Sequence, residues 1–194
     1  MQVLKGSDLV EVPWKNGGGV TRDIAAGRMG TRDAWRISRA DVACDGAFSD
    51  FAGLERILTV VSGAGMILRH AGGDLHAGLW QPVRFDGGLA VTSHLTNGPL
   101  TDLNLMFDPA LCEGSARVHQ EPVLLQPVLP DKGITALHIL AGRPQLNGQD
   151  LEIADTAFPS GPADLALWTG DAVLEVTVCH IAQSAAIRVF IAER

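Results

Sequence analysis

Residues 13–24 read Pro13-Trp14-Lys15-Asn16-Gly17-Gly18-Gly19-Val20-Thr21-Arg22-Asp23-Ile24. Three consecutive glycines add no side chain to a core and lose much backbone entropy on folding, so they indicate a loop. Lys15, Asn16 and Thr21 place donors of several kinds around this loop, which favours a backbone that faces a polar or anionic group. A flexible hairpin tip is the alternative interpretation. A phosphate-binding P-loop is excluded, because no Gly-Lys-Ser/Thr follows the glycines and no helical pattern opens after them.

On both sides of this loop the chain is a succession of short extended segments. Residues 35–40 alternate apolar and polar side chains, the period of a half-buried strand. The turn at 62–65 predicts a hairpin between its flanking segments, 27–33 reads as a polar turn, and 108–116 is the one candidate for a helical turn. Many short strands separated by Gly and Pro predict an all-β sandwich or barrel. The predicted strands are 1–12, 20–26, 35–40, 57–61, 66–68, 83–85, 89–95, 103–107, 122–129, 135–140, 151–154, 165–167, 173–178 and 187–191.

A weak internal sequence repeat suggests that the strands form two units. Residues 85–91 resemble 168–174, because each has an aromatic residue, glycine with aspartate, and then a strand. Each is followed at a similar distance by another predicted strand, 103–107 in one case and 187–191 in the other. This pattern predicts two stacked β units with a boundary near 117–120. Chance resemblance between β-rich segments is the alternative.

Composition excludes several classes of function. The 194 residues are 46% hydrophobic and carry a net charge of -7, with a pI near 5.2, which argues against a nucleic-acid partner. No apolar run approaches the ~20 residues that a membrane span needs, and residues 1–7 lack a signal-peptide core. Three widely spaced cysteines, Cys44, Cys112 and Cys179, suit a reducing compartment. We therefore expect a cytoplasmic protein without a membrane partner.

The sequence offers no familiar metal or nucleophile motif. No His-x-His pair or Cys-x-x-Cys occurs, so we expect no bound transition metal and no cofactor. No Gly-x-Ser-x-Gly elbow is present, and Cys44 lacks a cationic neighbour that would activate its thiol. The histidines that these patterns leave unassigned are His70, His76, His94, His119, His138 and His180.

Polar side chains at strand spacing are the better candidates for a site. Asp102, Asn104 and Met106 share one face of their strand, with apolar residues on the other. Arg36 and Ser38 repeat this pattern in the strand at 35–40. Such a face is either solvated or, in a small barrel, the lining of a ligand pocket. In the second case the basic residues and amides would suit a small molecule that carries a carboxylate.

Several of these stretches together resemble the HutD/Ves family. The resemblance covers about residues 1–110 and is most specific in the Trp-Lys-Asn-Gly-Gly-Gly stretch. The matching stretches are Pro13 to Gly19 with Thr21, Trp35-Arg36-Ile37-Ser38 with Ala40, Asp45-Gly46, Phe48-Ser49, Gly53, Arg56, Phe85-Asp86-Gly87 and Asp102-Leu103-Asn104-Leu105-Met106.

The resemblance implies a cupin fold, a double-stranded β-helix or RmlC-like jelly roll, with two germin-like barrels in one chain. Residues 1–118 would form the first barrel with the ligand pocket and 119–194 the second, with strands that can be exchanged between them. HutD is similar in genomic role to an accessory of bacterial histidine utilisation that binds or responds to an intermediate such as formylglutamate. Ves is the relative linked to cold and environmental stress. The metal-binding histidines of many cupins are missing, which argues against metal-dependent chemistry.

The leading hypothesis is therefore a metal-free cupin that binds a small anionic metabolite. One alternative is a metal-independent isomerase or hydrolase that uses Asp102, with His94, as a general acid or base. Another is a structural or protein-interaction role without a ligand, and a homodimer formed through a sheet is compatible with the sequence. The predicted ligand-binding residues are Trp14, Lys15, Asn16, Thr21, Arg36, Ser38, Phe48, Ser49, Arg56, Asp102 and Asn104.

Overall fold

Antiparallel strands make up nearly all the regular structure of this protein, whose computed structural model describes residues 1–14, 17–181 and 186–192. The described residues form twenty strands and one short 3-10 helix, η1 (Gly6–Asp8). The predicted all-β fold is confirmed. In the part of the chain that the structure describes, no helix has the length and apolarity to cross a bilayer.

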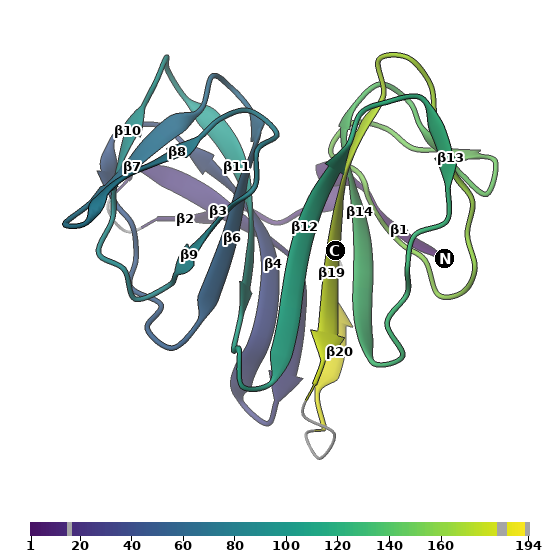
Figure 1. Ribbon diagram of the computed structural model, residues 1–194, viewed down its shortest axis with the longest axis horizontal. Helices are drawn as coiled ribbons and strands as arrows, with labels where there is room; N and C mark the ends of the chain where they lie inside the picture. Colours follow the sequence, from purple (N-terminus) through teal and green to yellow (C-terminus); the bar gives the residue numbers. More distant parts are fainter. Residues whose placement is uncertain (15–16, 182–185, 193–194) are drawn as a thin grey trace.

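Figure 1 shows two lobes side by side. The first lobe contains a seven-stranded sheet and a smaller sheet of four strands. In spatial order, the seven-stranded sheet contains β2 (Val12–Pro13), β3 (Gly19–Met29), β4 (Arg32–Val42), β11 (Leu100–Phe107), β6 (Glu55–Ser62) and β9 (Val83–Asp86), with β20 (Arg188–Ile191) also paired to β3. The four-stranded sheet contains β5 (Gly46–Ala47), β10 (Thr92–Leu95), β7 (Met66–His70) and β8 (Gly73–Ala77).

The second lobe repeats this arrangement with a five-stranded and a four-stranded sheet. The five-stranded sheet contains β1 (Gln2–Leu4), β17 (Thr156–Phe158), β14 (Gly133–Ala141), β19 (Ala172–His180) and β12 (Cys112–His119). The four-stranded sheet contains β13 (Val123–Leu125), β18 (Leu165–Leu167), β15 (Gln145–Leu146) and β16 (Gln149–Asp150). The predicted boundary near 118 falls within β12, and the division into 1–118 and 119–194 stays a prediction.

A central apolar core joins the two large sheets. Ile37 and Leu105 reach it from the seven-stranded sheet, and Leu174 and Val176 reach it from the five-stranded sheet. Because strand side chains alternate between faces, the intervening residues of the same strands point to the outer layers. The large sheets are therefore buried on both faces over much of their length.

Each lobe also has an outer core between its own two sheets. In the first lobe, Leu58 and Val60 of β6 belong to the same apolar cluster as Leu68 of β7. In the second lobe, Leu137 of β14 belongs to a cluster with Leu165 of β18. The molecule is thus built as four sheet layers, with the large sheets inside and the small ones outside.

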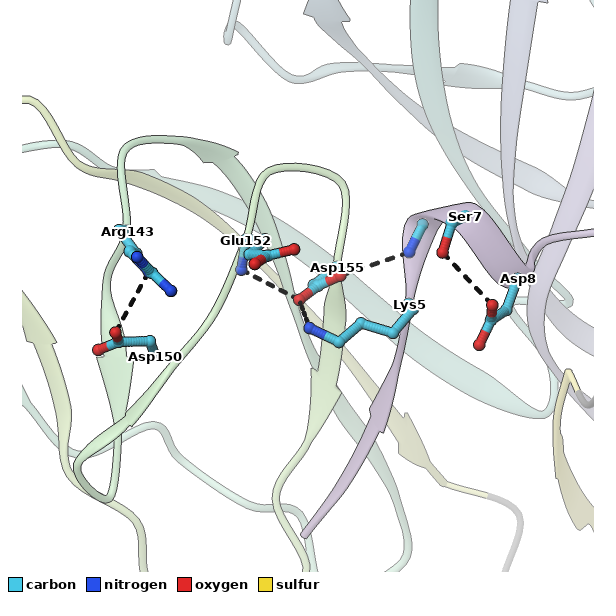
Figure 2. A network of polar contacts seen from close by, with 8 residues as sticks. Lys5, Ser7, Asp8, Arg143, Asp150, Glu152 and Asp155 are labelled. Carbon is cyan, nitrogen blue, oxygen red and sulfur yellow. Dashed lines mark hydrogen bonds and ion pairs between the residues drawn. The ribbon is translucent and has the colours of Figure 1, made fainter.

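Both ends of the described chain cross between the lobes. β1 pairs with β17 of the second lobe, whereas β20 pairs with β3 of the first. Buried Asp155 fixes the crossing of the amino-terminal segment: its carboxylate accepts hydrogen bonds from Lys5 Nζ (2.7 Å) and from the backbone N–H groups of Gly6 and Glu152 (Figure 2). A Cβ on Gly6 would lie 2.7 Å from that of Ala154, so the two segments approach closely.

Five local predictions were wrong. Residues 1–12 do not form one strand, because η1 lies between β1 and β2, which join different sheets. The strands around the 62–65 turn do not pair with each other, because β6 lies in the large sheet and β7 crosses to the facing one. Residues 108–116 form a turn and the start of β12, since their side chains alternate between buried and exposed. Residues 151–154 turn at Ala154, which has a φ of 72°, instead of forming a strand. The 27–33 turn shrinks to 30–31, because β3 and β4 pair as far as Met29 and Arg32.

Candidate functional site

A cavity of about 450 Å³ opens on the outward face of the seven-stranded sheet in the first lobe. Strands β4, β11 and β6 form its floor, and the segment from β5 to Phe51 forms the opposite wall. Pro13, Trp14 and Thr21 close its rim beside the glycine loop. The lining residues are Pro13, Trp14, Thr21, Arg36, Ser38, Ala40, Ala47, Phe48, Ser49, Phe51, Arg56, Asp102, Asn104 and Met106.

Strand register arranges the floor of the cavity in rows. Met106 lies opposite Arg36 of β4 on one side and Arg56 of β6 on the other. In the next row, Asn104 lies opposite Ser38. Since neighbouring strands are ~4.8 Å apart, the Cα atoms of the two arginines are separated by about 10 Å. Polar groups from three adjacent strands are therefore held at fixed spacing.

Arg56 is the most unusual residue of the cavity, because it is charged, only 4% exposed and free of any ion pair to the described residues. Its guanidinium carbon lies 5.0, 5.4 and 5.1 Å from the ring centres of Phe48, Phe51 and Phe85. Nη2 donates a hydrogen bond to Oδ1 of Asn104 (2.7 Å), while the buried Nε has no partner among the described residues. Burial lowers the pKa of Arg56 to about 10, against the opposing charge of Asp102.

Asn104 links this guanidinium to a buried carboxyl group. Its Nδ2 donates a hydrogen bond to Oδ1 of Asp102, which is 1% exposed. Burial raises the pKa of Asp102 to about 7, although the charge of Arg56 and the hydrogen bond from Asn104 oppose this shift. A group with such a pKa changes its charge near neutral pH, so Asp102 can hold or release a proton inside the cavity.

Arg36 has a different environment from Arg56. Its Nε donates to Oδ1 of Asp23 (2.6 Å), and the side chain is 29% exposed. The positive charge of Arg36 is therefore compensated at the mouth of the cavity, whereas that of Arg56 is enclosed. At the rim, Trp14 Nε1 donates to Thr21 Oγ1 (2.7 Å), which orients the indole beside the opening.

The structure brings together nine of the eleven residues predicted from the sequence, and Lys15 and Asn16 lie outside the described residues. Whether these residues bind a ligand stays a prediction. Period-two alternation was the signal for two residues that the prediction missed, since Met106 continues the face of Asn104 and Ala40 continues that of Ser38. The other missed lining residues, Pro13, Ala47 and Phe51, lie beside predicted ones in the chain.

His94 and a metal site were also considered from the sequence. His94 lies outside its lining and contacts Asp45 through Nδ1 (3.1 Å). Among the described residues, no three His, Cys, Asp or Glu side chains are placed to hold a metal ion together. The polar residues that line the cavity offer hydrogen bonding, charge and proton exchange.

Comparison with known proteins finds the HutD family model matched over residues 6–185. The chain is 40% identical over 114 residues to a 21.2 kDa protein in the hutC 3' region of Pseudomonas putida, and 37% identical over 108 residues to protein Ves of Citrobacter koseri. These alignments cover 56% and 54% of this chain, but only 59% and 56% of the relatives, so the chain matches little more than half the length of either.

Among solved structures, HutD from Pseudomonas fluorescens SBW25, determined in a formate condition, superimposes with a TM-score of 0.80 at 28% identity. The match covers 92% of this chain and 98% of that one. Protein Ylba from E. coli, at 9% identity, covers 91% of this chain and 90% of its own with a TM-score of 0.67, which concerns the fold alone. The predicted cupin jelly roll is confirmed by these likenesses.

Proposed function

Because the chain belongs to the HutD family and encloses an arginine without an ion-pair partner among the described residues, we propose that its first lobe binds a small carboxylate-bearing metabolite of the formylglutamate type and so modulates histidine utilisation. The relative in the hutC 3' region and the HutD likeness support the metabolic setting. The cavity itself supports the ligand class. We place this activity in the cytoplasm, as the sequence predicts.

The environment of Arg56 is the observation that carries the proposal. Buried charges in proteins are normally paired, because removing an ion from water costs several kcal/mol. Arg56 instead has one neutral acceptor, Asn104, and an Nε that meets no partner in the described part of the chain. A ligand carboxylate would provide the missing charge, and hydrogen bonds between a guanidinium and a carboxylate are among the strongest in proteins.

The remaining lining fits a ligand of modest size. A volume of about 450 Å³ lies at the small end of the range for small-molecule sites. Ser38 and Ser49 supply hydroxyl groups, while Phe48 and Trp14 supply apolar walls. This mixture suits a short carbon chain with a polar group at each end.

Calorimetric titration with formylglutamate, urocanate and glutamate tests the proposal. We expect at least one of them to bind the wild type, and Arg56→Met to lose that binding. Arg69→Met is the matched control, because Arg69 is exposed and pairs at 3.7 Å with Asp74 in the outer sheet. Folded wild-type protein that gives no heat with any of the three ligands would overturn the proposal.

A second candidate function rests on Asp102. A carboxyl group inside a cavity with a pKa of about 7 is suited to general acid–base catalysis, as in a metal-independent isomerase or hydrolase. His94 would take no direct part, since it lies outside the lining. Turnover of a bound ligand, followed by NMR and lost in folded Asp102→Asn, would favour catalysis over binding alone.

A further inference from the structure

The Arg56–Asn104–Asp102 chain of hydrogen bonds places a cationic and an acidic side chain in one cavity. Asn104 accepts from Arg56 through Oδ1 and donates to Asp102 through Nδ2, so one amide connects the two ionisable groups. Both groups line the space that a ligand would enter. In the absence of a ligand, the carboxylate of Asp102 is the negative group that these two hydrogen bonds connect to the Arg56 cation.

Resting on the proposed function, we propose that binding of a small organic anion beside Arg56 is coupled to uptake of one proton by Asp102. The anion would form its ion pair with the same guanidinium that Asp102 relies on through Asn104. Two negative charges would then share one cation beside side chains that are almost fully buried, and like charges in such an environment disfavour double ionisation. The site thus takes up the anion together with a proton and binds more tightly as the pH falls.

No other described neighbour of Asp102 provides a free positive charge that could stabilise its carboxylate. On β4, Arg36 is paired with Asp23, and Asp41 bonds to Arg22 and Thr101 and acts to raise the pKa of Asp102 further. The described residues that line the facing wall and the rim are uncharged: Pro13, Trp14, Thr21, Ala47, Phe48, Ser49 and Phe51. Arg56 is therefore the cation for which ligand and Asp102 compete.

The expected size of the effect follows from the pKa of about 7 in the empty cavity. At pH 8, about nine tenths of the Asp102 carboxyl groups are ionised before binding, so binding should take up roughly 0.9 proton. At pH 6 most are already protonated, and the uptake should fall to roughly 0.1 proton. Between pH 7 and the higher pKa of the complex, the dissociation constant should rise by up to ~tenfold per pH unit.

Calorimetry at pH 6 and pH 8 measures this uptake directly when formylglutamate is titrated, at each pH, in two buffers of different ionisation enthalpy, such as MES and Bis-Tris at pH 6 and HEPES and Tris at pH 8. Carboxylates of this kind have pKa values of about 4 and do not titrate in this range, so the proton comes to the protein. Asp102→Asn mimics the protonated carboxyl group, so it should show no uptake and bind more tightly than wild type at pH 8. Asp74→Asn, in the outer sheet, should behave as wild type.

Each outcome decides a different point. Binding with uptake below ~0.2 proton at pH 8 would overturn the coupling but leave anion binding standing. Uptake that persists in Asp102→Asn would assign the proton to another group and overturn the role of Asp102. Absence of binding of formylglutamate, urocanate and glutamate alike to the folded wild type would overturn both proposals. Should Asp102→Asn not fold, the wild-type contrast between pH 6 and pH 8 still identifies a group with a pKa of about 7.

Discussion

Replacing Asp102 with asparagine should stabilise the free protein at neutral pH and have little effect in acid. Burial raises the pKa of Asp102 from 3.8 to about 7 in the folded protein. A carboxyl group with a higher pKa in the folded state binds protons more readily there than in the unfolded chain. The free energy of unfolding therefore falls as the pH rises from about 4 to about 7, and the penalty is complete above that range.

The magnitude follows from the same two pKa values. A rise from 3.8 to about 7 corresponds to about 4 kcal/mol, because a tenfold change in a proton-binding constant is worth about 1.4 kcal/mol. His138 acts in the opposite direction: burial, with a smaller contribution from Arg39, lowers its pKa from 6.5 to about 3. The stability contributed by neutral His138 is present above pH 6.5 and is lost as the pH falls. In the wild type, the pH dependence of the free energy of unfolding that comes from Asp102 cancels the opposite dependence that comes from His138 between about pH 4 and 6.5.

Urea unfolding followed by tryptophan fluorescence at pH 4 to 8 separates these contributions. Asp102→Asn should match the wild type near pH 4 and exceed it by up to about 4 kcal/mol at pH 8. In this variant the free energy of unfolding should rise with pH by about 1.4 kcal/mol per pH unit, because only His138 then contributes. In His138→Asn it should instead fall with pH, because only Asp102 then contributes. A difference between Asp102→Asn and wild type that is constant over this pH range would refute the reasoning.

Three further predictions concern single residues. Arg56→Met should abolish anion binding in calorimetry yet change the free energy of unfolding by less than about 2 kcal/mol, since losing the hydrogen bond offsets relief from a desolvated charge; a larger loss would make Arg56 a structural residue. Gly27→Ala should destabilise by about 1–3 kcal/mol in urea, because its Cβ would lie 2.0 Å from Trp35 Nε1; unchanged stability would contradict this packing. His94→Ala should leave formylglutamate affinity within about twofold, because His94 contacts Asp45 outside the cavity, and a tenfold loss would return it to the site.

Alternation along single strands was enough to predict which residues of β4 and β11 share the face that lines the cavity. Asp102 and Asn104 share a face at a spacing of two residues, and this holds whatever the strand pairs with. The sequence could not show whether that face is solvated or enclosed. The answer depends on the segment from β5 to Phe51, which packs over the face in the folded protein. The 62–65 turn was misread for a related reason: the residues of a turn do not specify which sheet the next strand joins.

The difference between the two arginines lay equally beyond the sequence. Arg36 and Arg56 occupy equivalent positions in their strands, yet Asp23 of the neighbouring β3 neutralises Arg36 alone. Phe85, which contacts the Arg56 guanidinium, reaches it because β9 pairs with β6 in a register that places the two residues opposite each other. Pairing partners, and not the local pattern, decide which cation remains available.

Strand β11 holds the buried polar residues of the cavity in place. All eight residues of this strand are buried, and it is hydrogen-bonded to β4 on one side and β6 on the other. Leu103 and Leu105 place its inner face in the central core, so Asp102 and Asn104 lie on the outer face that lines the cavity. The second lobe fills the equivalent space between its sheets with aliphatic side chains. A supported strand on one side and a polar cavity on the other make the first lobe the half of the molecule in which we expect the proposed anion to bind, with Arg56 as its ion-pair partner.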